Sequence, residues 1–263
     1  MSSNKDTVGG TIKVALILCV VCSVFISSAA VILKPFQVSN KLLDRNKNIL
    51  IAAGMFDPAL NSDSEVDALF AQFDLQVVDL DSGEALSAER LAELNIDPAT
   101  YDERAVFSDA QYSDAIPADE DVADLKRRVK YATVYTLDAS DGSLETIVLP
   151  ISGYGLWGTM YGYLALDGDG NTVNGIGFYD HKETPGLGGE INNPRWKALW
   201  PGKQIFDADG DVALSVVKGA GEGVHEVDGL SGASLTSRGV DNMIEFWLGS
   251  NGFGPFLTNL SEG

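Results

Sequence analysis

The sequence is poor in the residues that build several common kinds of site. Two cysteines and two histidines in 263 residues are too few for a disulfide-rich scaffold or a Cys/His zinc module. The sequence has only 18 lysines and arginines but 38 aspartates and glutamates, which gives a net charge of −20. A protein this acidic would be repelled by a phosphate backbone. One short basic run, at 126–130, does not offset that charge. We therefore expect no nucleic-acid partner and no metal site.

Long uncharged runs are also scarce, and one stands out. Val14–Leu33 holds twenty residues without a charge, which as a helix would span about 30 Å, the thickness of a bilayer core. A cleaved signal peptide is the alternative, because Ser28–Ala30 resembles a cleavage site, but the apolar part of such peptides usually runs about 7–15 residues. We predict a tail over residues 1–13 and a retained single span in the lipid bilayer over 14–33. Basic residues on the two sides nearly balance, so charge alone leaves the orientation open.

Both cysteines, Cys19 and Cys22, lie inside this span. Two thiolates cannot complete a four-coordinate metal site, and a thiol in lipid behaves as a small apolar group. The pair is therefore interpreted as apolar helix surface, and a cluster shared with another protein of a complex is left open.

Residues 34–130 are predicted to form a membrane-proximal helical region. A helix over 39–53 continues from the span and stops at Gly54, and a shorter helix over 64–73 precedes a strand over 77–80. The acidic stretch 97–124 is interpreted as a solvated insertion. Calcium binding is the alternative function for this stretch, but the spacing of its aspartates fits no calcium loop.

Residues 131–263 have the pattern of a second domain. Alternating apolar residues predict strands over 133–137, 146–150, 161–166, 172–179 and 212–217, and helices over 192–199 and 234–248. Asp167–Gly170 and Asp207–Asp211 are interpreted as turns, because neither continues into a complete EF-hand loop. The predicted fold class is α+β, a mostly antiparallel sheet flanked by helices behind one transmembrane helix.

Two glycine-rich segments could bind a ligand. His181–Glu190 follows a strand and offers exposed N–H groups and little side-chain bulk, which suits a flat or anionic ligand. Val227–Ser237 leads into the last long helix, where free N–H groups and the helix dipole favour a phosphate. The plainer alternatives are a tight loop without ligand and a helix capped by Ser231 or Ser234.

Together these segments carry a resemblance to a known family. Ser231–Thr236 reads SGASLT with Asp228 upstream, and this resembles the flavinylation motif of FMN-binding domains, Asp-x-x-Ser/Thr-Gly-Ala-Ser/Thr-x-Thr. HKETPGLGG at 181–189 resembles the flavin-contacting loop of the same domains, and Gly155–Gly158 also matches. The resemblance covers most of the chain and is closest to the C-subunit family of the Na⁺-translocating NADH:quinone reductases. It implies an FMN-binding domain over 131–263 with covalently bound FMN.

The resemblance implies roles for residues of the motif. Ser234 is expected to hold the FMN phosphate as a phosphoester, although most members of the family have threonine there, and Thr236 is the fallback acceptor. Asp228 is expected to orient the motif during attachment by a separate flavin transferase. The remaining motif residues are expected to surround the cofactor: Ser231, Gly232, Ala233 and Leu235.

Further residues are expected to contact the flavin from outside the motif. Those expected to line the ring or ribityl chain are Glu183, Thr184, Leu187 and Gly188. Trp157 is expected to pack against the isoalloxazine or, alternatively, in the core. Lys218 is expected to balance the phosphate charge.

The function implied by the resemblance is electron transfer. In this family electrons pass from NADH through FAD and iron–sulfur centres to this FMN, then to a second covalent FMN and onward to riboflavin and quinone, coupled to sodium export. The chain would act with other membrane subunits, with its soluble part on the periplasmic side of the bacterial inner membrane. It would be one part of an oxidoreductase that is not catalytically complete alone, and no catalytic residue is assigned.

Two alternatives remain open. One is the G subunit of the related Rnf electron-transport complex, which shares the motif; the long amino-terminal half and the stretch 48–54 favour the NADH:quinone reductase. The other is a membrane-tethered binding module without flavin, in which SGAS acts only as a helix cap.

Overall fold

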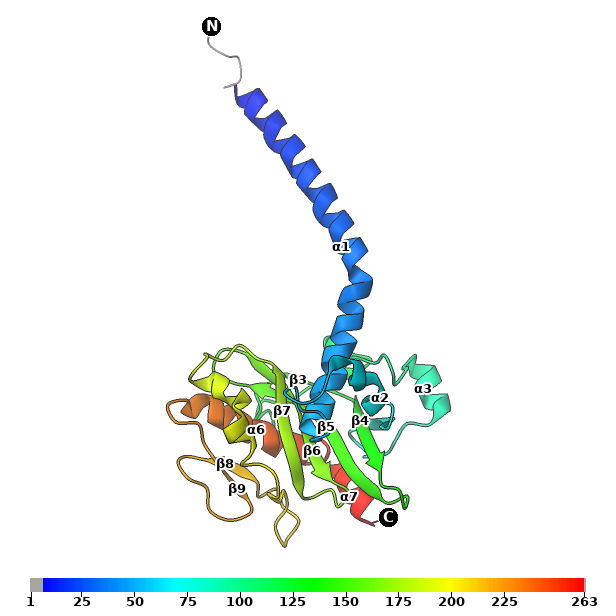
Figure 1. The fold of residues 1–263 in the computed structure, drawn as a ribbon, viewed down its shortest axis with the longest axis vertical. Helices are drawn as coiled ribbons and strands as arrows, with labels where there is room; N and C mark the ends of the chain where they lie inside the picture. The colour runs from blue at the N-terminus through cyan, green and yellow to red at the C-terminus, as the bar shows by residue number, and fades with distance from the viewer. Residues whose placement is uncertain (1–6, 263) are drawn as a thin grey trace. The chain divides into compact units, whose positions relative to one another are not determined.

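The computed structural model describes residues 7–262 and forms two compact units, Met1–Arg45 and Asn46–Gly263. Residues 1–6 of the predicted tail lie outside the described residues. Helix α1 (Val8–Ala52) contains the whole predicted span and the predicted helix that continues it (Figure 1). Within the described residues α1 is the one helix long and apolar enough to cross a membrane, and the side chains of its most apolar window are unburied. Cys19 and Cys22 are free and exposed there.

Helix α1 ends at a glycine, as the sequence predicts. The N–H of Gly54 donates to the carbonyl of Ile51 at 3.1 Å, and that of Met55 donates to Leu50 at 2.8 Å. Gly54 has φ +71°, the left-handed conformation that this pair of bonds requires and that glycine adopts without a Cβ penalty.

The main sheet has five strands, all antiparallel, in the order β1-β4-β5-β6-β7. Their bounds are β1 (Asp74–Asp79), β4 (Tyr131–Asp138), β5 (Leu144–Tyr154), β6 (Thr159–Asp167) and β7 (Val173–Asp180). Each contains most or all of a predicted strand, so the predicted fold class is confirmed.

Strand β1 joins two regions that the sequence predicts as separate. It belongs to the predicted membrane-proximal region, yet it pairs along its length with β4, with Val77 opposite Thr133 and Val78 opposite Ala132. The sheet is therefore continuous across residue 130, and a domain boundary at that point stays a prediction.

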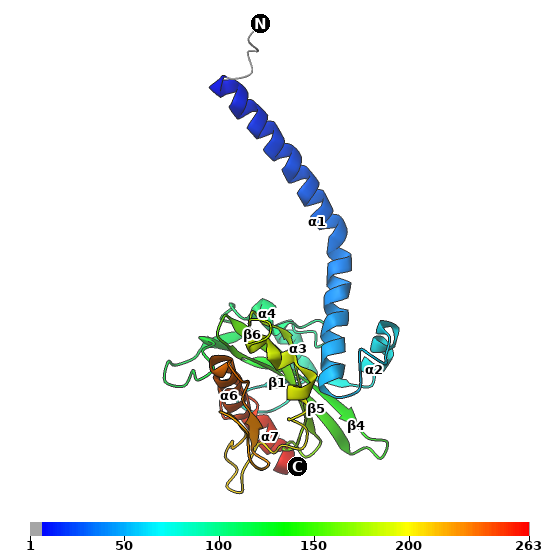
Figure 2. The same cartoon turned by 60° about the vertical axis from the view of Figure 1, so that its left-hand side comes forward.

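Helices cover both faces of the sheet (Figures 1 and 2). One face packs against α6 (Ser234–Leu248), where a Cβ added to Gly153 of β5 would lie 2.9 Å from Met243 Cβ. The other face packs against the last turns of α1, where a Cβ added to Gly175 of β7 would lie 2.4 Å from the carbonyl oxygen of Ala52. The short elements around the sheet are η1 (Asp63–Glu65), α2 (Val66–Phe70), α3 (Ala88–Leu94), η2 (Gly188–Asn192), α5 (Pro194–Lys197) and α7 (Gly254–Glu262).

The acidic stretch 97–124 is not wholly solvated, and that interpretation is wrong for its inward-facing residues. It contains α4 (Glu103–Val106) and β2 (Ser113–Ala115), which pairs with β3 (Arg127–Val129). Tyr101 is buried and donates its hydroxyl to the carbonyl of Tyr131 at 3.1 Å. Most of its carboxylates lie at the surface, while Tyr101 and Ser113 are buried, and the inward-facing Glu103 accepts from the N–H of Thr133 at 2.8 Å.

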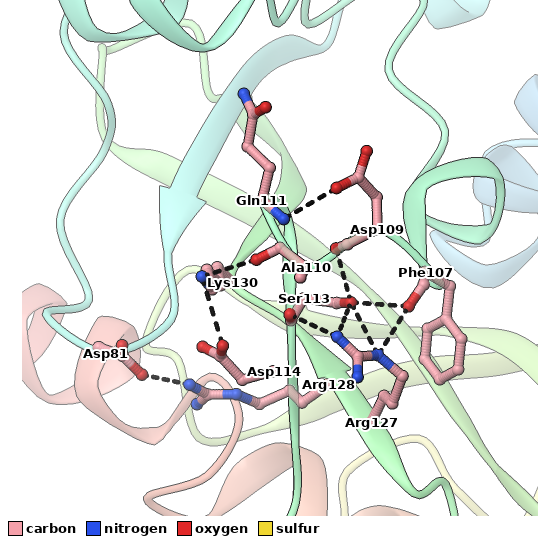
Figure 3. A network of polar contacts seen from close by, with 10 residues as sticks. All are labelled: Asp81, Phe107, Asp109, Ala110, Gln111, Ser113, Asp114, Arg127, Arg128 and Lys130. Atoms are coloured by element: carbon pink, nitrogen blue, oxygen red, sulfur yellow. Dashed lines mark hydrogen bonds and ion pairs between the residues drawn. The ribbon is translucent and has the colours of Figure 1, made fainter.

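The basic run beside it holds this hairpin together (Figure 3). Arg127 donates to the carbonyls of Phe107 at 3.3 Å and Ser113 at 2.7 Å and to the buried Ser113 hydroxyl at 2.9 Å. Arg128 donates to the carbonyl of Asn251 at 3.0 Å and pairs with Asp81. Both arginines are therefore engaged in contacts within the folded chain.

Many of the acidic side chains shape turns. Asp169 Oδ1 accepts from the N–H of Asn171 at 2.8 Å and of Thr172 at 2.7 Å. Asp207 Oδ1 accepts from the N–H of Asp209 at 2.9 Å. A carboxylate that bonds the backbone two residues on is a recurrent turn former, so both turn predictions are confirmed, and part of the negative charge serves local structure.

Candidate functional site

The candidate site begins at the amino terminus of α6, which starts at Ser234 as predicted. The N–H of Ala233 donates to the carbonyl of Leu230 at 3.1 Å, and Gly232 has φ +77°, so the four residues Leu230–Ala233 form a turn that needs glycine in third place. Ala233 is the capping residue and provides no side-chain bond. Capping by Ser231 or Ser234, the alternative open from the sequence, is therefore wrong.

The uncapped start of α6 leaves donors free. Among the described residues, no atom accepts a hydrogen bond from the N–H groups of Ser234, Leu235 and Thr236. Such N–H groups, at the positive end of a fifteen-residue helix, form a ready site for a phosphate or another anion.

The two candidate acceptor hydroxyls lie in different environments. Ser234 is exposed, whereas the Thr236 side chain is 1% exposed and its Oγ1 donates to Glu183 Oε2 at 2.5 Å. Two residues along a helix are separated by about 200° around its axis, so the hydroxyls face opposite sides. Ser234 is the hydroxyl that an external reagent could reach.

A second turn lies against this helix start. The N–H of Leu187 donates to the carbonyl of Thr184 at 3.1 Å, with Pro185 in second place and Gly186 at φ +77° in third, which is the arrangement of a type II turn. Thr184 and Leu187 are exposed, while Gly188 is buried. A Cβ added to Gly188 would lie 2.4 Å from Thr236 Oγ1, so only glycine lets the loop approach α6 this closely.

Glu183 connects these parts from the interior. Its side chain is 4% exposed, and Oε1 accepts from the N–H of Leu156 at 2.9 Å and of Trp157 at 3.0 Å, while Oε2 accepts from Thr236. All of these donors are protein groups. The carboxylate is therefore engaged by protein donors, and the contact of Glu183 with the ribityl chain or ring stays a prediction.

Apolar side chains remain uncovered around the helix start. Trp157 is 61% exposed, which rules out the alternative that it packs in the core. Leu156, Leu187 and Leu235 are also exposed large apolar residues, and a Cβ added to Gly232 would lie 3.5 Å from Leu187 Cδ2. Two loops and the first turn of α6 thus carry exposed apolar groups around a helix start with free N–H groups, an arrangement suited to a flat aromatic ligand that carries a phosphate.

Asp228 and Lys218 lie at the ends of a small parallel pair, β8 (Ser215–Val217) and β9 (Glu226–Asp228). Asp228 Oδ1 accepts from the N–H of Gly221 at 2.8 Å, so this carboxylate fixes the turn after β8. The N–H of Gly229 donates to the carbonyl of Val217 at 2.7 Å, which brings the motif beside exposed Lys218. No ion pair found in the described chain involves Lys218, so its ammonium is available to an anion.

Three structural residues of the site escaped sequence reasoning. Ser237 Oγ accepts from the N–H of Leu230 at 2.8 Å and donates to the carbonyl of Ala233 at 3.1 Å, which pins the turn before α6. Trp196 Nε1 donates to the carbonyl of Asp228 at 2.7 Å. A third, Asp241 of α6, accepts from Val216 at 2.7 Å, and burial raises the pKa of its carboxyl. Only the Ser237 hydroxyl, four residues after Ala233, left a recognisable local signal.

Comparison with known proteins agrees with this geometry. Residues 155–249 match the family model described as FMN-binding domain, a range that includes both turns, Trp157 and α6. The chain is 51% identical to the C subunit of the Na(+)-translocating NADH-quinone reductase of Pseudomonas aeruginosa, over 99% of each chain. It is 41% identical to the protein of the same name from Vibrio alginolyticus, over 100% of this chain and 99% of the relative.

A solved structure has the same fold. The crystal structure of Shewanella oneidensis NqrC superposes with a TM-score of 0.76 at 34% identity and covers 86% of this chain and 100% of its own. Identity at this level along the whole length favours this family over the Rnf G protein that the motif alone leaves open. The chain therefore belongs to the C-subunit family of the Na⁺-translocating NADH-quinone reductases, and it carries their FMN-binding domain.

Proposed function

We propose that this protein carries one FMN as a phosphoester on Ser234 Oγ and relays electrons within the NADH-quinone reductase complex. The observation that carries the proposal is the contrast between the two hydroxyls. Ser234 stands exposed at an uncapped helix start, while Thr236 is buried and bonded to Glu183. A serine that neither caps its helix nor packs in the core is free for modification.

The site fits such a cofactor in charge and shape. The free N–H groups of Ser234, Leu235 and Thr236, with Lys218 nearby, would hold the phosphate. Leu156, Trp157, Leu187 and Leu235 would provide the apolar contacts for the ring; these and the exposed Thr184 and Ser231 are the residues we assign to it. Bound FMN supplies one- and two-electron redox chemistry, and the protein supplies binding, orientation and electrostatic tuning.

The protein acts as a carrier and not as the complete enzyme. We assign it no NADH or quinone site, so electrons reach it from one partner in the complex and leave to another, and the flow from NADH toward quinone is coupled to sodium export. Sodium crosses through other subunits, because a single helix with an uncharged span provides no ion path. A separate flavin transferase attaches the FMN.

We also propose that α1 anchors the chain in the inner membrane with residues 46–263 on the periplasmic side. The uncharged, unburied run within α1 supports the anchor. Labelling of intact cells with a membrane-impermeant amine reagent tests the orientation. Lysines such as Lys126 and Lys203 should react in intact cells, and labelling only after lysis would contradict it.

Mass spectrometry tests the attachment. Trypsin should release Gly219–Arg238, since no lysine or arginine lies between Lys218 and Arg238. In protein from its own host this peptide should carry the mass of FMN less one water, with fragments that place it on Ser234. An unmodified peptide from that host would contradict the proposal and would favour a membrane-tethered binding module without flavin.

A further inference from the structure

Among the described residues, Glu183 is the one aspartate or glutamate that is buried as a whole residue, and no ion pair found there includes it. Burial of a carboxylate is costly unless hydrogen bonds satisfy it. Here three donors do so: two backbone N–H groups 26 and 27 residues upstream and a hydroxyl 53 residues downstream. The carboxylate therefore joins two segments that are distant in the sequence.

The surroundings leave room for this carboxylate and little else. A Cβ added to Gly155 would lie 2.5 Å from Glu183 Oε1, and one added to Gly188 would lie 2.5 Å from Oε2. On the helix, a Cβ added to Gly239 would lie 2.5 Å from the carbonyl oxygen of Tyr154. The loop that carries Trp157 is thus packed closely against α6, with the carboxylate between them.

The side chain of Trp157 has little else to fix it. Its indole is 61% exposed, so packing contributes little to its position, whereas its N–H is one of the two that Glu183 Oε1 accepts. We infer that Glu183 is a positioning residue: its carboxylate ties the Leu156–Trp157 loop to Thr236 in the first turn of α6, and this tie sets where the Trp157 indole meets a flavin attached at Ser234. This inference rests on the proposed function, because it gives the indole its purpose as a flavin contact.

The inference predicts a spectroscopic signature. An indole held against a flavin quenches flavin emission, so loss of its positioning should lengthen the fluorescence lifetime of the bound FMN. The full chain would be produced with a flavin transferase and studied in detergent. Trp157→Phe and Glu183→Ala should each lengthen the lifetime, and the double variant should lengthen it no further, because coupled residues give non-additive effects.

Two variants control for a merely structural effect. In Glu183→Gln one oxygen still accepts the two backbone N–H groups, and the new amide can donate to Thr236 Oγ1, so the lifetime should stay at the wild-type value. Glu190→Ala removes a carboxylate from the same loop, one bonded to Asn193 Nδ2 at 2.6 Å, and should also leave it unchanged. A wild-type lifetime in Glu183→Ala, or additive effects in the double variant, would overturn the inference. If Glu183→Ala does not fold, Glu183→Asp takes its place, because its shorter side chain cannot reach both sets of donors.

Hydrogen exchange separates failure of this inference from failure of the proposed function. In flavin-free Ser234→Ala protein, the further change Glu183→Ala should speed amide exchange at Leu156 and Trp157, whereas Glu183→Gln should not. If the wild-type chain carries no FMN, the proposed function fails and the flavin-contact role fails with it. Faster exchange would then show only that Glu183 holds the Leu156–Trp157 loop. If FMN is attached and exchange rises while the lifetime does not change, Glu183 supports the fold only and the inference is wrong.

Discussion

Replacement of the two neighbouring hydroxyls should give opposite results. Ser234→Ala should abolish covalent FMN while the free energy of unfolding changes by less than about 0.5 kcal/mol, the usual range for an exposed residue without a special contact. Thr236→Val should keep the FMN but lower the free energy of unfolding by about 1–3 kcal/mol, because it removes the donor from a buried carboxylate oxygen. The contrast follows from the exposure of Ser234 and the 2.5 Å bond of Thr236.

The assay combines two measurements on the same preparations. Flavin fluorescence after denaturing electrophoresis reports covalent FMN, since a bound but unattached flavin is lost. Thermal unfolding reports stability, and each kcal/mol should shift Tm by about 2–4 °C for a unit of this size. The comparison should use flavin-free protein, so that ligand binding does not add to the difference.

Two outcomes would refute the reasoning. Fluorescence that persists in Ser234→Ala and disappears only when Thr236 is changed would make Thr236 the acceptor and would mean that α6 rearranges to expose it. A loss of about 1 kcal/mol or more in Ser234→Ala would show that the serine caps the helix after all.

Three further predictions concern the framework. Arg127→Ala should lower the free energy of unfolding by about 1–3 kcal/mol, because the carbonyl and the buried hydroxyl of Ser113 lose their hydrogen bonds to the guanidinium; the exposed Arg90→Ala is the control, and equal effects would contradict the prediction. Burial raises the pKa of Glu103 above 4.5, so the folded state binds that proton more tightly and stability falls as pH rises from about 4.5 through the folded-state pKa; Glu103→Gln should flatten this decline in Tm-against-pH curves, and an unchanged slope would refute it. Gly188→Ala should cost about 1–3 kcal/mol through overpacking and lower flavin occupancy, and a wild-type Tm would contradict the close approach.

Local sequence determined a large part of this protein. The uncharged run of α1 and its glycine stop, the alternation of strands β4 to β7 and the start of α6 at Ser234 all follow from short-range pattern. Each depends on residues within one element, where periodicity and turn chemistry are sufficient. The resemblance of the 228–236 motif likewise led to the FMN-binding family, which the comparisons confirm.

Tertiary structure alone decided what depends on residues far apart in the chain. Strand β1 pairs with β4, which lies more than fifty residues further along the chain, and no local sequence pattern predicts that pairing. The many carboxylates of the stretch 97–124 suggest from sequence that it is solvated, although Tyr101 is buried in the folded chain.

The same division holds within the candidate site. Sequence places Ser234 and Thr236 two residues apart, and the resemblance favours Ser234 as the acceptor with Thr236 as the fallback, although the chemistry of the two hydroxyls is alike. Only the packing of α6 turns Thr236 toward the buried Glu183 and leaves Ser234 in solvent. Burial is a property of the assembled fold, so the difference in exposure between the two hydroxyls could be seen only once α6 had a neighbour.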